Sequence, residues 1–160
     1  MKRIRLLWLA GILITSGGCD STTAPDGEGR LLGRLEGEIW RGSALMDFSD
    51  DTLTIHSARS ADQGLEHVLH LRVVETAPGA FAVVTQAPPG RRSEYQEILG
   101  GDGIVYSAVV TAGTIRFTEL DRRRGRASGT LSLTLTGTRG TWRFADGHFE
   151  ARSWRDPYER

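Results

Sequence analysis

The sequence predicts an all-β domain, an antiparallel β-sandwich or barrel of about eight to ten strands. Apolar and polar residues alternate with a period of two over many short segments, as in strands with one buried face. Turn residues separate these segments about every eight to twelve residues. No amphipathic helix of useful length interrupts them. We therefore expect a meander, with strands joined mostly by local hairpins.

The clearest strand is "SGTLSLTLTGT", in which Leu131, Leu133 and Leu135 fall on one face and hydroxyl residues on the other. "TIRFTEL" repeats the pattern, with Ile115 and Phe117 predicted to point inward. "TLTIHS" is a third strand of this kind. The segment "QGLEHVLHL" also fits helical spacing, but the valines that continue the run favour a strand.

Turn signals divide the predicted strands. They are Ala77–Gly79, Gly100–Gly103 and Asp121–Gly125. A further signal is Asp146-Gly147, between "TWRFA" and "HFEAR". Because type I′ turns need positive φ and favour Asp-Gly, we expect a closing hairpin there.

The N-terminus has the order of a secretory signal peptide. "MKRIR" is positively charged, and an apolar run follows from Leu6 to Ile14 before small polar residues. The run is roughly half of what a membrane-spanning helix needs. We expect a signal peptide over residues 1–18, a flexible tether over 19–30, a β domain over 31–155 and a C-terminal tail over 156–160.

The chain contains one cysteine, Cys19, within "SGGC". This motif resembles the lipobox of bacterial lipoproteins, which implies that Cys19 is acylated and becomes the first residue of the mature chain. The alternative is an unmodified cysteine beside an ordinary cleavage site. Two or more acyl chains hold a protein stably on a bilayer. The resemblance therefore implies an exported, membrane-anchored lipoprotein of the bacterial cell envelope, facing the periplasm or lying on the outer surface.

The charge balance argues against a nucleic-acid partner. Removing Lys2, Arg3 and Arg5 with the signal peptide leaves 17 basic against 20 acidic residues, so the mature chain is weakly acidic. Four arginines nevertheless cluster in one turn. As a candidate surface contact, they would meet anionic lipid headgroups or lipopolysaccharide; alternatively they form a solvated turn. These residues are Arg122, Arg123, Arg124 and Arg126.

Catalytic and metal-binding patterns are not evident in the sequence. His67 and His70 are three residues apart, which places them on opposite faces of a strand, and we expect strand histidines to face solvent. No nucleophile–base pair or G-x-S-x-G motif is visible. We therefore expect no enzyme activity, no cofactor and no metal site. Trp40, Trp142 and Trp154 either line a ligand pocket or fill a core, and the core is favoured.

Three segments in this order resemble a domain-of-unknown-function family of small bacterial secreted and lipid-anchored β proteins. They are "LEGEIWRGSA", with Glu36-Gly37 in its turn, "GTIRFTELDRRRGRASGTLSL" and "FADGHFEAR". The resemblance implies an antiparallel β fold and an envelope location. It implies no reaction.

The sequence thus predicts a lipid-anchored, non-enzymatic envelope protein that contacts another envelope component or serves structurally. The alternative is a lipocalin-like binder of a small apolar ligand, since a barrel of about eight strands can hold one such molecule. A large empty cavity would favour the binder, and a filled core would favour the contact protein.

Overall fold

The computed structural model describes residues 29–49, 51–77, 79–100 and 103–153. The predicted signal peptide, Cys19 and the predicted C-terminal tail lie outside these ranges. Within them, no helix is long and apolar enough to cross a membrane.

The described chain is almost entirely strand, as predicted, and its one helical element is the short 3-10 turn η1 (Asp62–Gly64). Nine strands follow one another along the sequence. They are β1 (Gly29–Leu35), β2 (Glu38–Ser49), β3 (Thr52–Ser60), β4 (Leu65–Ala77), β5 (Ala80–Val83), β6 (Glu94–Leu99), β7 (Gly103–Asp121), β8 (Arg126–Gly137) and β9 (Gly140–Ser153).

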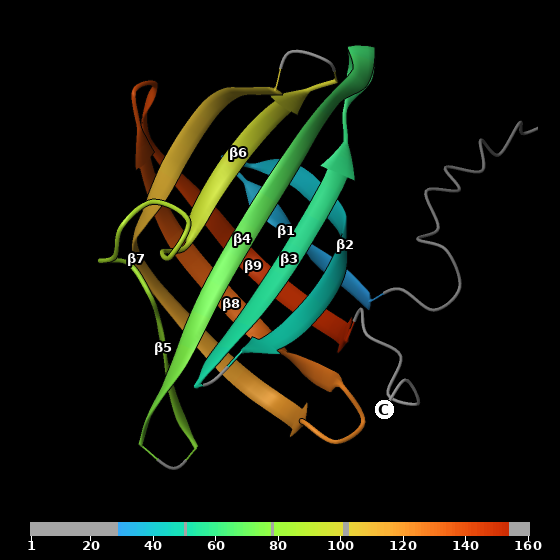
Figure 1. The fold of residues 1–160 in the computed structure, drawn as a ribbon. Coiled ribbons are helices and arrows are strands. Elements are labelled where there is room, and N and C mark those ends of the chain that lie inside the picture. The colour runs from blue at the N-terminus through green and yellow to red at the C-terminus, as the bar shows by residue number, and fades with distance from the viewer. Residues whose placement is uncertain (1–28, 50, 78, 101–102, 154–160) are drawn as a thin grey trace, which may run out of the picture.

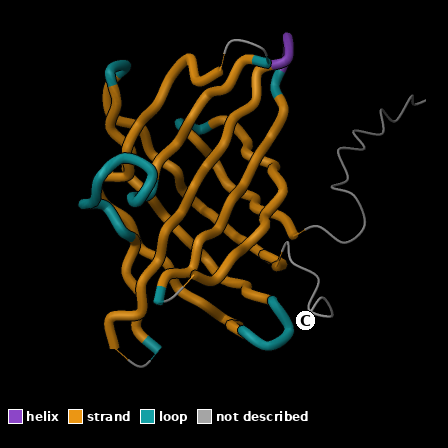
Figure 2. The backbone as a smooth tube through the Cα atoms, viewed as in Figure 1, coloured by secondary structure: helices purple, strands orange, loops and turns teal. Residues whose placement is uncertain are grey.

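Eight of these strands close into an antiparallel barrel, which decides between the two predicted architectures (Figure 1). Consecutive strands are neighbours from β1 to β4 and from β6 to β9, and β1 pairs with β9. The pairing of β3 with β4 completes the ring, from Thr52 opposite Val74 to Ser60 opposite Glu66. The strands run at a slant around the barrel, and most connections are short (Figure 2).

The ninth strand, β5, completes the wall near one end. β6 pairs with the first half of β4, from Leu65 to His70, and β5 pairs with the second half, from Val73 to Ala77. The two strands therefore use the same edge of β4, one after the other. This arrangement brings β5 beside β7, where the rings of Phe81 and Phe117 lie 4.7 Å apart.

The barrel has two ends of different chemistry. The arginine end is formed by the last residues of β2 and β4, the first residues of β3 and β5, and the β7–β8 hairpin (121–126), at the bottom of Figure 1. The polar end is formed by the β1–β2, β3–β4 and β8–β9 connections, the last residues of β6 and the first residues of β7.

The interior is filled by the side chains of the strands themselves. Alternate residues point inward, and all eight barrel strands contribute to one continuous apolar cluster. Leu131, Leu133 and Leu135 are buried as predicted, and so is Ile115. The largest completely buried side chains are Trp40, Tyr95, Phe144, Leu31, Met46 and Ile55.

The predicted hairpin at Asp146-Gly147 is wrong, because β9 runs without a break from Gly140 to Ser153. Leu131 and Leu133 of β8 face Gly147 and Phe144 of β9, so β9 carries one extra residue there. The pairing with β1 shifts at the same place. Asp146 does adopt a positive φ of 53°, but it does so in a β-bulge. The bulge reverses the alternation, which keeps Phe149 inside the barrel like Phe144.

The other predicted turns are confirmed, and "LEHVLHL" belongs to a strand, β4. The first hairpin turns at Glu36 and Gly37, both with positive φ. One boundary differs, because β1 begins at Gly29, inside the predicted tether. A Cβ on Gly29 would lie 2.1 Å from the carbonyl oxygen of Glu150 and 2.3 Å from that of Ala44. Only glycine therefore fits between the two neighbouring strands at this point.

Gly33 makes room for a large core ring. A Cβ at this position would lie 2.6 Å from the ring of Phe144, which is 1% exposed and packs edge-to-face on Trp40. Such pairing of a small residue with a large neighbour lets side chains fill a narrow barrel.

We expect Gly33→Ala to destabilise the protein by about 1–3 kcal/mol, since the added methyl overpacks a closed interior. Thermal unfolding followed by circular dichroism measures this as a loss of several degrees. Gly100→Ala is the matched control, because the nearest atom to its Cβ is 3.8 Å away. Equal melting temperatures for the two variants would contradict the packing described here.

Candidate functional site

The four arginines predicted as a surface contact all belong to the β7–β8 hairpin. Asp121 shapes its turn by accepting hydrogen bonds from the backbone N–H groups of Arg123 and Arg124, at 3.0 and 2.9 Å. All four arginines are exposed. The structure thus places Arg122, Arg123, Arg124 and Arg126 together at the arginine end of the barrel.

Arg122 differs from the other three arginines because its side chain contacts strands β4 and β2. Its Nη2 donates to Oε2 of Glu75 on β4 at 3.0 Å. Its guanidinium carbon lies 5.4 Å from the centre of the Phe48 ring on β2, within the range of a cation–π contact. Arg122 therefore links the hairpin to two strands that are not its neighbours in the sheet.

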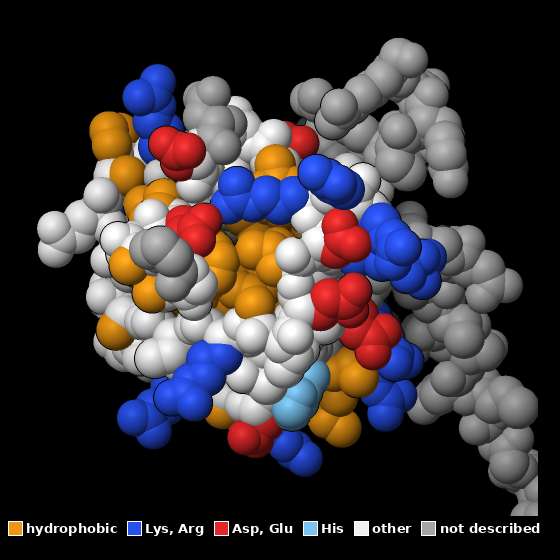
Figure 3. Space-filling view, turned by 90° about the horizontal axis from the view of Figure 1, so that it is seen from below, with side chains coloured by type: hydrophobic (Ala, Val, Ile, Leu, Met, Phe, Trp, Pro, Cys, Tyr) orange, Lys and Arg blue, Asp and Glu red, His pale blue; other side chains and the backbone are white. Residues whose placement is uncertain are grey.

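Apolar side chains gather behind this arginine. Seen from below, the arginine end shows hydrophobic side chains at the floor of a hollow, with basic and acidic side chains at its rim (Figure 3). Five partly buried apolar residues from this part of the barrel pack against the core. They are Phe48, Phe81, Val83, Phe117 and Leu120.

The polar end contains a chain of buried and partly buried hydrogen bonds that sequence reasoning missed. Tyr95 donates its hydroxyl proton to Oε1 of Glu97 at 3.2 Å, and Nη1 of Arg139 donates to Oε2 at 2.8 Å. Nδ1 of His67 contacts the Tyr95 hydroxyl oxygen. Because that hydroxyl has a single proton, already donated to Glu97, the His67 Nδ1–H is the donor. The chain joins β4, β6 and the β8–β9 turn.

Burial controls the ionisation of the side chains that form these hydrogen bonds. It raises the pKa of Tyr95 well above its usual range, and the neighbouring Glu97 raises it further by charge and by accepting the hydrogen bond. Burial also lowers the pKa of His67, assisted by the charge of Arg59. The phenol therefore stays protonated at neutral pH, and it acts as a hydrogen-bond donor rather than a nucleophile.

Aromatic rings surround these polar groups. Trp40 and Trp142 contact Tyr95 edge-to-face, with centroids 6.4 and 5.6 Å away. Trp40 is completely buried and Trp142 partly buried against the core, in agreement with the expectation that tryptophans fill the core. Trp154 lies outside the described residues. Arg59 lies over Trp40, and Arg139 lies over Tyr106.

The expectation that strand histidines face solvent is wrong for His67, which points inward. The signal was present in "SEYQEIL", where Tyr95 and Glu97 alternate onto one face. A carboxylate on the same face as buried aromatic residues indicates a polar group inside the fold. Its partners are far away in the sequence, which is why the pattern alone did not identify them.

His56 and His70 face outward and meet across the β3–β4 seam. Their Nδ1 atoms are 3.2 Å apart, so one ring donates and the other accepts. Burial, together with the charges of His56 and Arg72, lowers the pKa of His70 to about 4. Burial also lowers the pKa of His56, against the opposing effect of Glu66. Among the described residues, no group of three or more His, Cys, Asp or Glu is placed to hold a metal ion.

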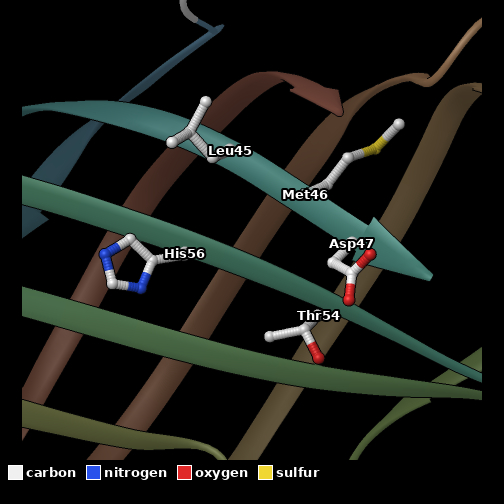
Figure 4. Close-up of a pocket in the computed structure, with 5 residues that line it drawn as sticks. All are labelled: Leu45, Met46, Asp47, Thr54 and His56. Carbon is white, nitrogen blue, oxygen red and sulfur yellow. The ribbon is translucent and has the colours of Figure 1, made fainter. Parts of the chain in front are cut away.

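Two pockets lie on the outer wall of the barrel. The first, of about 310 Å³, lies over β2 and β3 (Figure 4). Its lining residues are Leu45, Met46, Asp47, Thr54 and His56. The second, of about 350 Å³, crosses β1, β7, β8 and β9 and includes His148 and Thr130. Outward-pointing residues such as His56 and Thr130 contribute to their linings.

Comparison of the chain with protein-family models, curated proteins and solved structures finds no match. The site is therefore interpreted from its own geometry.

The histidine pair predicts how stability depends on pH. Folding lowers the pKa of His70 from its ordinary value of 6.5 to about 4, so the unfolded chain takes up the proton first as the pH falls. The free energy of unfolding should be constant above about pH 6.5 and should fall as the pH drops from there towards 4. In His70→Gln, the free energy of unfolding should fall less over this pH range.

Denaturant unfolding at a series of pH values measures the effect. His148→Gln is the control, because His148 is exposed on the outer wall. A pH profile that is the same in His70→Gln as in the unchanged protein would contradict the assignment.

Proposed function

We propose that the protein is a lipid-anchored, non-enzymatic envelope protein whose barrel contacts another envelope component through its outer surface and its arginine end. The sequence motif at Cys19 and the leader before it support the anchor. The β-barrel fold is compatible with this function and with the lipocalin-like alternative.

The observation that carries the proposal is the filled interior. An eight-stranded barrel either packs its own side chains or leaves room for one small ligand. Here a continuous cluster of buried apolar residues from all eight barrel strands occupies the centre. This supports a contact protein over a carrier that encloses an apolar ligand in the middle of its barrel.

The hydrogen-bond chain at the polar end supports a structural role for that end. Tyr95 and Arg139 each donate a hydrogen bond to Glu97, which is only 7% exposed. A buried carboxylate with its charge and hydrogen bonds satisfied is costly to disturb. We interpret this chain as a closure of the barrel rather than as catalytic machinery.

The position of β1 supports an orientation with the arginine end near the membrane. Gly29 approaches Ala151, and Ser153, two residues further along β9, donates its backbone N–H to the carbonyl of Gly125 in the arginine hairpin at 2.8 Å. The ten residues 19–28 would reach at most about 35 Å when fully extended. A barrel anchored at Cys19 would thus keep its arginine hairpin close to anionic headgroups.

Cys19→Ser should move the protein from the membrane fraction to the soluble fraction, since the variant lacks the sulfur that carries the acyl chains. Fractionation with immunodetection measures the distribution, and mass spectrometry of the mature chain measures the added lipid. Ser21→Ala, which leaves Cys19 in place, should stay in the membrane fraction. Membrane association of Cys19→Ser, or an unmodified Cys19 in the mature protein, would remove the anchor from the proposal.

A further inference from the structure

The hollow at the arginine end combines an apolar floor with a rim of charged side chains, in which the hairpin arginines lie beside acidic groups such as Glu75 and Asp121 (Figure 3). The floor includes Phe48 and Phe117, which remain partly exposed although the core above them is closed. Above it, Met46 and Val73 are each 1% exposed and fill the barrel. The hollow is therefore a shallow recess at one end and does not continue through the molecule.

The apolar side chains that project from the protein lie elsewhere. Ile39, Ile104 and Val105 are 54%, 57% and 48% exposed and belong to strand segments near the polar end. Leu32, 40% exposed, lies in the middle of β1 on the outer wall. At the arginine end the apolar rings are recessed behind the rim. A recess of this kind receives a narrow apolar group, whereas insertion of the barrel into a bilayer would need projecting apolar residues.

The rim provides an anion-binding group that can move. Arg122 and Glu75 form an ion pair at 3.0 Å, with side chains 52% and 36% exposed. Exposed ion pairs of this type contribute little to stability, so the pair can open at little cost. An arginine released from Glu75 presents a planar fork of donors that matches a carboxylate or phosphate.

Other cations of the hairpin add to the positive charge of the rim. Arg124 lies 3.8 Å from Asp121, and Arg123 and Arg126 have no ion-pair partner among the described residues. These arginines and the apolar floor together complement an amphiphile with a negative head.

We propose that the arginine end binds a single-chain anionic amphiphile, with the end of its hydrocarbon chain on the phenylalanine floor and its head group on Arg122. The head group displaces Glu75 from Arg122, so the ion pair acts as a gate. This names a chemical class for the envelope component that the proposed function leaves open. It rests on that function for the cellular source of the amphiphile, while the binding itself is a property of the barrel.

The test uses the full-length Cys19→Ser protein, which carries no acyl group, and isothermal titration calorimetry with alkyl carboxylates from hexanoate to dodecanoate, below their micellar concentrations. Each buried methylene should raise affinity about fourfold until the hollow is filled. Longer chains should then bring no further gain. Alcohols of equal chain length should bind more weakly, since they lack the negative head.

Variants of Arg122 and Glu75 measure the contribution of the head group to binding separately from that of the hydrocarbon chain. Arg122→Ala should weaken dodecanoate binding about tenfold and leave dodecanol binding unchanged. Glu75→Gln should strengthen dodecanoate binding, because Arg122 is then freed. Arg143→Ala, an exposed arginine of β9 near the polar end, is the matched control and should change neither.

A variant of the apolar floor tests where the hydrocarbon chain of the ligand binds. Phe81→Asp should abolish binding of both dodecanoate and dodecanol, and Ile104→Asp at the polar end should not. Thermal melts of all variants show whether each one is folded. Glu75→Gln removes only a charge at an exposed site, so a gain in affinity there supports the proposal even if Phe81→Asp does not fold.

Three results of the calorimetric titrations would overturn the proposal. They are the absence of dodecanoate binding, equal binding of dodecanoate and dodecanol, and an equal loss of affinity in Arg143→Ala and Arg122→Ala. Binding to vesicles that contain anionic lipid, without binding of monomeric dodecanoate, would instead identify a surface contact and would also overturn it. The fractionation of Cys19→Ser tests the anchor separately, so failure of one proposal is distinguishable from failure of the other.

Discussion

Closure of eight strands around a narrow interior is the constraint on which the rest of this structure depends. A barrel of this size has just enough room for the side chains of its own strands. Every inward position must therefore match the volume of its neighbours, which is why the ring of Phe144 lies over Gly33 and why Gly29 has no side chain. The same constraint leaves little space for a ligand in the centre, so the candidate binding sites lie on the wall and at the ends.

The two ends meet this constraint in different ways. At the polar end, inward positions carry His67, Tyr95 and Glu97, and a cross-barrel ion pair with Arg139 satisfies the buried carboxylate. At the arginine end, inward positions remain apolar up to the rim, and the exposed ion pair between Arg122 and Glu75 lies beside them. An end whose buried carboxylate is paired and hydrogen-bonded is suited to a structural role, whereas an apolar recess beside a weak ion pair is suited to binding.

An anchored barrel with a binding recess at one end is a consistent arrangement. The chain enters the barrel at Gly29, and β9 ends beside the same hairpin that carries the four arginines. A tether attached there would hold the recess close to the bilayer, where anionic amphiphiles are concentrated. The anchor and the recess depend on different residues, Cys19 and Arg122, so each proposal can fail without the other.

The all-β class and the positions of most strands could be predicted from the sequence, because alternation and turn chemistry are local properties. Leu131, Leu133 and Leu135 were placed on the inner face from spacing alone, and the turns at Ala77–Gly79 and Asp121–Gly125 followed from residue type. The Asp146-Gly147 pair shows the limit of local evidence. Its positive φ was predicted, but the same conformation serves a hairpin or a bulge, and only pairing with β1 and β8 decides between them.

The tertiary structure alone decided between a sandwich and a barrel, since this depends on whether β3 pairs with β4. It also decided which polar residues meet. His67, Tyr95, Glu97 and Arg139 are distant in sequence and converge only when the ring is closed. Likewise, four neighbouring arginines look alike in the sequence, yet only Arg122 spans to Glu75. Local spacing determines which way a side chain points, and the closure of the sheet determines what it meets.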